Sequence, residues 1–128
     1  MSLESLARFA VSFSAPYAVL ALAAIGSSIV ERAGILNLAI DGLFVYAAAA
    51  AYTFNVVLSA ALGGSPWIPI LSLAIAAATT ALIGILRTFL STALPVHQGA
   101  LGLSLMFACY GVAAIVGNSG VNMFSQLP

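Results

Sequence analysis

The polar side chains that could act on a solute in this 128-residue chain gather around one predicted helix. At 100° per residue, Asn37, Asp41, Ala48, Tyr52 and Asn55 fall within about 60° of one another. Amide, carboxylate and phenol groups on one face can exchange hydrogen bonds with a polar solute, so this face is a candidate solute path. The same residue types also form hydrogen-bonded seams between membrane helices, and the pattern leaves both interpretations open.

Catalytic and metal chemistry finds little support in the sequence. The one histidine, His97, lies in "LPVHQGA", where an interfacial turn residue is favoured over a proton relay. The one cysteine, Cys109, lies in an apolar run without a second thiol, so it is interpreted as a packing residue. We find no Ser-His-Asp pattern and no Walker-type glycine loop. We therefore expect no enzyme activity, no metal site and no cofactor bound by this chain.

Composition defines the class of protein. The chain is 63% hydrophobic and 5% charged, and its mean hydropathy is +1.20. An average soluble domain has about 25% charged residues, so this is a membrane protein. The net charge is zero, which leaves no basic surface to neutralise phosphates and excludes nucleic acid as a partner.

Hydropathy and length predict an all-α membrane protein, in a single transmembrane domain over residues 1–128. A helix needs about 20 apolar residues to cross the hydrocarbon core. Four segments meet this condition: residues 9–30, 42–62, 67–87 and 99–117. The "GGSP" after Leu62 predicts a helix stop and a turn. The spacing Ala113-x-x-x-Gly117 predicts close approach of the last helix to a neighbour.

Membrane orientation depends on three arginines. Arg32 and Arg87 flank the second and third spans, which puts them on one membrane face with Arg8 on the other. The positive-inside rule then places Arg32 and Arg87 in the cytoplasm and the N-terminus outside. We expect the Arg87 guanidinium to extend from its span into water.

The segment "ERAGILNLAIDG", residues 31–42, precedes the second span and holds three of the six formally charged side chains. A continuous helix from residue 33 to 62 would exceed the membrane core, so we expect a broken or extended polar segment, with Gly34 and Gly42 as the breaks. A carboxylate in lipid costs about 2.5 to 3.5 kcal/mol, so Asp41 should face protein or water. Glu31 and Arg32 are expected to anchor the segment at the interface.

The same segment resembles a signature of ABC importer permeases, E-R-x-G-x-x-N-L-G-x-E-G, in the nucleoside and simple-sugar branch of the ribose/branched-chain amino acid permease family. The matching residues are Glu31, Arg32, Gly34, Asn37, Leu38 and Gly42. Ala39 replaces the usual Gly, and Asp41 replaces the usual Glu with a shorter carboxylate. The later "HQGALGLSLMFACYG" is similar to the family's segment two helices downstream.

The resemblance implies a multi-pass permease of the plasma or inner membrane that carries a nucleoside or simple sugar. Its implied partners are membrane lipid, a second permease subunit, cytoplasmic ATP-binding subunits that bind the ATP, and an extracytoplasmic solute-binding protein. The match covers what would be the N-terminal half of such a permease, as a fragment, a truncated gene product or one part of a split permease. An ion-coupled secondary transporter and a non-transporting membrane assembly subunit are the alternatives, the first because Asp41 lies in a glycine-interrupted helix.

Overall fold

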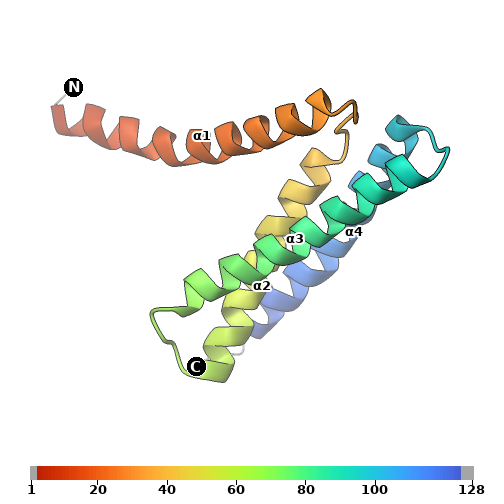
Figure 1. The fold of residues 1–128 in the computed structure, drawn as a ribbon. Coiled ribbons are helices and arrows are strands. Elements are labelled where there is room, and N and C mark those ends of the chain that lie inside the picture. Colours follow the sequence, from red (N-terminus) through yellow and green to blue (C-terminus); the bar gives the residue numbers. More distant parts are fainter. Residues whose placement is uncertain (1–2, 125–128) are drawn as a thin grey trace. The chain divides into compact units, whose positions relative to one another are not determined.

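The computed structural model describes the backbone of residues 3–124, and the side chains of that range apart from residues 3, 7, 10, 13, 15, 16, 123 and 124. The described backbone is helical apart from short connections (Figure 1). Its helices are α1 (Leu3–Arg32), α2 (Ile40–Leu62), α3 (Ile68–Ala93) and α4 (Gln98–Phe124). The expected all-α membrane architecture is therefore confirmed.

The chain divides into two compact units, which are described separately. The first unit ends at Asn37 and contains α1 with the start of the following connection. The second unit begins at Leu38 and contains α2, α3 and α4. The break between the units falls inside the "ERAGILNLAIDG" segment.

Three helices are long and apolar enough to cross a membrane within the described residues: α2, α3 and α4 as far as Asn122. They correspond to the second, third and fourth predicted spans. The third and fourth helices continue beyond the predicted ends, to Ala93 and Phe124. The first predicted span lies inside α1, which is helical throughout, and its crossing of the membrane stays a prediction.

Local signals explain where α2 and α3 end. Gly63 adopts φ 71°, and its N–H donates to the Ser59 carbonyl at 3.1 Å, closing the last turn of α2. Gly64 follows with φ 80°, so the predicted glycine stop is confirmed. The α3 helix ends at Ala93, just before Pro95.

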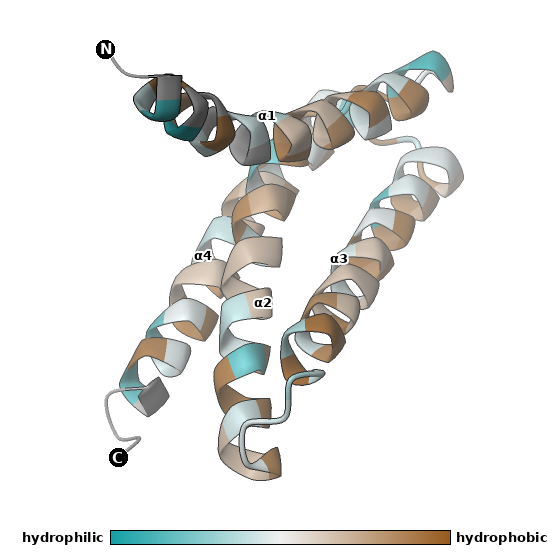
Figure 2. Ribbon diagram, turned by 90° about the vertical axis from the view of Figure 1, so that its left-hand side faces the viewer, coloured by the Kyte–Doolittle hydropathy of each residue, from teal (hydrophilic) through white to brown (hydrophobic). Residues whose placement is uncertain are grey.

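In the second unit, α2 lies between α3 and α4, which touch each other little (Figure 2). Leu38 lies beside Gly102, whereas Thr53 lies beside Gly120, so α2 and α4 run in the same direction. The α3 helix returns between them in the chain and runs the opposite way. Large apolar side chains are exposed on these helices, such as Leu73 and Leu82 on α3 and Phe107 on α4.

Candidate functional site

The start of the "ERAGILNLAIDG" segment closes α1 with a Schellman motif. Gly34 has φ 83°, and its N–H donates to the Glu31 carbonyl at 2.9 Å. The N–H of Ile35 donates to the Val30 carbonyl at 3.3 Å. These two bonds define the motif and satisfy carbonyls that would otherwise lack partners at the helix end. The prediction that the backbone leaves the helix at Gly34 is therefore confirmed.

A polar network then holds the connection against the last turns of α1. The Ser27 hydroxyl donates to Glu31 Oε1 at 3.2 Å, and it accepts a hydrogen bond from Asn37 Nδ2 at 3.2 Å. We call Ser27, Glu31 and Asn37 the Ser27 network. Sequence reasoning missed Ser27, although its position four residues before Glu31 on a helix was the available signal. The network gives Glu31 and Asn37 a structural hydrogen bond each.

The predicted helical face is wrong for Asn37. Because α2 begins at Ile40, Asn37 lies in the extended connection, and helical spacing does not relate it to Asp41. Residues 41, 48, 52 and 55 do lie on one helix, within about 60° of one another. The shared face therefore begins at Asp41.

Gly42 is not a break in the helix, which corrects the second predicted break. It is the third residue of α2 and is buried. A Cβ atom at this position would lie 2.6 Å from the carbonyl oxygen and 2.7 Å from the Cα of Met106 in α4. Glycine is needed here because the two backbones nearly touch.

The α2–α4 contact is lined with small residues along its length. A Cβ on Gly102 would lie 3.0 Å from Leu38 Cβ, and one on Gly117 would lie 3.7 Å from Ala49 Cβ. Ala113 is buried between these glycines. The predicted close approach at Ala113-x-x-x-Gly117 is confirmed, and we call this contact the glycine seam.

Two hydrogen bonds join α2 to its neighbours at mid-length. Thr53 Oγ1 donates to the Val116 carbonyl of α4 at 2.8 Å. On the other flank, Asn55 Nδ2 donates to Ser72 Oγ of α3 at 3.4 Å, and Ser72 is buried. These bonds fix the rotation of α2 about its own axis, because one bond lies on each side.

The side of α2 that α3 and α4 leave uncovered carries the remaining predicted solute-path residues. Asp41, Ala48 and Tyr52 are exposed, and Asn55 is half-buried beside them. Ala48, Tyr52 and Asn55 lie in the middle third of the 23-residue helix, close to mid-depth in a membrane. Asp41 lies in its first turn, where a carboxylate complements the positive end of the helix dipole. We call Asp41, Ala48, Tyr52 and Asn55 the open face.

Comparison with known proteins supplies the family. Residues 9–127 match the sequence model of the family described as branched-chain amino acid transport system / permease component. The chain belongs to this permease family. No curated protein and no solved structure matches the chain.

Membership makes the chain a permease component of an ABC-type transport system. Together with the three apolar spanning helices, it places this permease in the plasma membrane as a multi-pass protein. Of the three functional hypotheses drawn from the sequence, membership selects the transport permease. It also indicates a transport component in place of an enzyme.

Arg87 of the permease does not extend into water as expected from the sequence. It is 4% exposed, and its Nε atom is shielded from solvent. The cause is its position on α3, since Ser72, Ala76 and Arg87 fall at the spacing of one helix face, which packs inward. Arg32, by contrast, is exposed at the end of α1.

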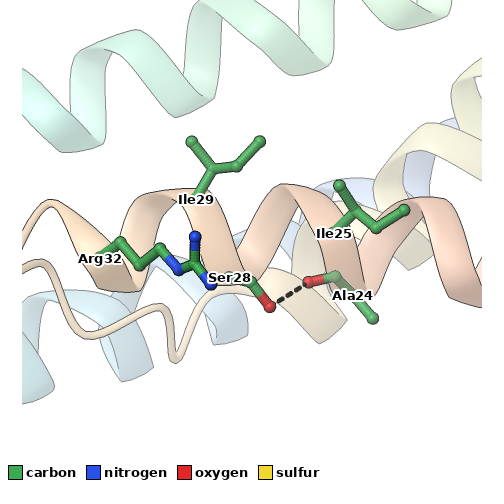
Figure 3. Close-up of a pocket in the computed structure, with 5 residues that line it drawn as sticks. All are labelled: Ala24, Ile25, Ser28, Ile29 and Arg32. Atoms are coloured by element: carbon green, nitrogen blue, oxygen red, sulfur yellow. Dashed lines mark hydrogen bonds between the residues drawn. The ribbon is translucent and has the colours of Figure 1, made fainter.

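Two hollows are lined by residues other than those of the open face. A hollow on α1 is formed by one helix and is lined by Ala24, Ile25, Ser28, Ile29 and Arg32 (Figure 3). A cavity of about 180 Å³ lies between α3 and α4 over Tyr46, about 200° around α2 from Ala48. Its wall is apolar and includes Cys109, which is buried as expected of a packing residue.

His97 has a structural role in the described chain. It precedes α4, and its Nδ1 accepts a hydrogen bond from the Ala100 N–H at 3.4 Å, which caps the helix. The interpretation as a turn residue is consistent with this contact. Within the described residues, no group of three or more His, Cys, Asp and Glu side chains could hold a metal ion.

Proposed function

We propose that this permease forms part of the translocation path for a nucleoside or a simple sugar, and that the solute passes along the open face of α2. The observation that carries the proposal is the position of the exposed Tyr52 and the half-buried Asn55 at mid-depth on a membrane helix. Tyrosine is otherwise enriched at the membrane interface, about 15 Å from the midplane. Polar groups at mid-depth in membrane proteins face protein or a water-filled cavity, and they commonly mark solute pathways.

Asp41 extends the proposed path to the N-terminal end of α2. It lies on the open face, about three turns before Tyr52, and it is exposed in the first turn. The predicted topology puts this end of the path on the cytoplasmic side, where a carboxylate can accept hydrogen bonds from the hydroxyl groups of a sugar ring that is leaving the path. Its place near the interface lowers the cost of its charge below the cost at the membrane centre.

The rest of the machinery belongs to partner subunits in this proposal. ATP binds to cytoplasmic ATP-binding subunits that drive transport, and an extracytoplasmic solute-binding protein delivers the solute. A second permease subunit packs beside this one, and the chain itself supplies the N-terminal half of a permease. The family's role in ABC-type transport and the "ERAGILNLAIDG" pattern support these partners.

Cysteine accessibility in the complete transporter tests the path. With Cys109 replaced by Ala, Ala48→Cys places a thiol on the open face, and Ala78→Cys is the matched control. Ala78 is exposed at mid-depth on α3, about 200° from the buried Ala76. We expect a water-soluble thiol reagent to modify residue 48, to block uptake, and to leave residue 78 unmodified. An inert thiol at 48 in a transport-competent complex contradicts the path.

Uptake by the same transporter, with its solute-binding protein, tests the solute class. A labelled nucleoside, a labelled simple sugar and a labelled branched-chain amino acid are compared. We expect uptake of the nucleoside or the sugar. Uptake of the amino acid alone would refute the solute class and leave the path intact.

A further inference from the structure

The ring of Tyr52 is held in place by α4. A Cβ atom on Gly120 would lie 3.1 Å from Tyr52 Cδ1, so the ring edge rests against the glycine backbone. Tyr52 is nevertheless 41% exposed. The ring is therefore supported on one side and accessible from the open face.

The backbone that carries this ring is also fixed. Thr53, the next residue, bonds to the Val116 carbonyl at 2.8 Å. A Cβ atom on Gly120 would also collide with Thr53, because it would lie 2.6 Å from the Thr53 Oγ1. Gly120 and Thr53 thus act as positioning residues that set both the height and the rotation of the Tyr52 ring.

Asn55 places an amide beside the ring. It lies three residues after Tyr52, which puts the two side chains on adjacent turns of one face. One of its N–H groups is directed to Ser72 at 3.4 Å. A side-chain amide has two N–H donors and a carbonyl acceptor, so Asn55 can still offer a donor and an acceptor.

We propose that Tyr52 and Asn55 form a base-recognition subsite, an inference that rests on the proposed solute path. The Tyr52 ring stacks on the base of a nucleoside, and the Asn55 amide exchanges hydrogen bonds with the base edge. An aromatic face beside a donor and acceptor pair complements a planar base with donors and acceptors along its edge. The subsite would select nucleosides over free sugars and over aliphatic amino acids.

Protection of a neighbouring thiol measures this binding. Ala48→Cys lies one turn before Tyr52 on the open face, and solute bound at Tyr52 should slow its modification. The assay uses the complete transporter without its solute-binding protein, in the Cys109→Ala background. A nucleoside, the corresponding free base and D-ribose are titrated, and the concentration that halves the modification rate is recorded.

We expect the nucleoside and the free base to protect at lower concentrations than D-ribose. Stacking on an aromatic side chain contributes about 1 to 3 kcal/mol per base, so Tyr52→Leu should raise the nucleoside concentration about 5- to 150-fold. Tyr52→Phe keeps the ring and should retain tight protection. Tyr110→Leu, which removes an exposed ring from α4, is the matched control and should cause no shift.

Two results would overturn the subsite. The first result, measured without any substitution at Tyr52, is that D-ribose protects at the same concentration as the nucleoside while the free base gives no protection. The other is an unchanged nucleoside concentration in Tyr52→Leu. In both cases a modifiable thiol at 48 still supports the path, whereas an inert thiol there contradicts the path itself.

Discussion

Gly42→Ala should destabilise the permease because it places a methyl group between two backbones. The new Cβ would lie 2.6 Å from the Met106 carbonyl oxygen and 2.7 Å from its Cα. Non-bonded heavy atoms prefer about 3.5 to 4.0 Å, so α2 and α4 must separate by roughly 1 Å at this point. Neither partner atom belongs to a side chain that could rotate away.

The magnitude follows from comparison with Gly111→Ala, which is on α4, the helix that carries Met106. A Cβ on Gly111 meets nothing within 4 Å. Both substitutions gain the helix propensity of alanine, up to about 1 kcal/mol, and this gain cancels between them. The remaining difference is the cost of overpacking, about 1 to 3 kcal/mol. At ~4 °C per kcal/mol, the midpoint for Gly42→Ala should fall about 4 to 12 °C below that for Gly111→Ala.

Cys109 is a built-in probe for this measurement. It is the chain's one cysteine, and it is 3% exposed. A fluorogenic maleimide should react with it only as the helices separate on heating in detergent micelles. Equal midpoints for Gly42→Ala and Gly111→Ala would refute the close backbone contact at Gly42.

Two further predictions concern the connection and the orientation. Ser27→Ala and Asn37→Ala should each lower the free energy of unfolding, and a double-mutant cycle should give a coupling of about 0.5 to 1.5 kcal/mol, which additive effects would exclude. In the Cys109→Ala background, an impermeant thiol reagent outside the cell should modify Ser65→Cys and not Val96→Cys. The reverse labelling pattern would refute the predicted topology. Val96 is a better labelling position than Arg87 because Val96 is exposed and Arg87 is buried.

Sequence reasoning succeeded where the determining interactions are local. The glycine stop after Leu62 and the break at Gly34 depend on backbone conformations that glycine adopts within a few residues. The spans followed from hydropathy, although their ends shifted by up to seven residues at Phe124, because polar residues continued the helix.

The errors share a different cause. Gly42 and Arg87 were misplaced because their surroundings come from another helix or from an inward-packed face, which spacing within one segment does not reveal. Asn37 was assigned to the face of α2 because a helical period was extended past the true start at Ile40. Tyr52 and Asn55 stayed on the open face because they lie well inside a helix whose period was read correctly.

The glycine seam has a mechanical consequence for transport. Close contacts at Gly42, near the start of α2, and at Gly120, which meets Thr53 at mid-length of α2, oppose sliding or rolling of α2 past α4, because either movement would bring atoms into collision. We therefore expect α2 and α4 to move together as one rigid unit. We expect a change in the transporter's shape to displace α3 from α4 more readily than α2 from α4, because α3 touches α4 little. Tyr52 would then keep its place between α2 and α4 while other parts of the proposed path move.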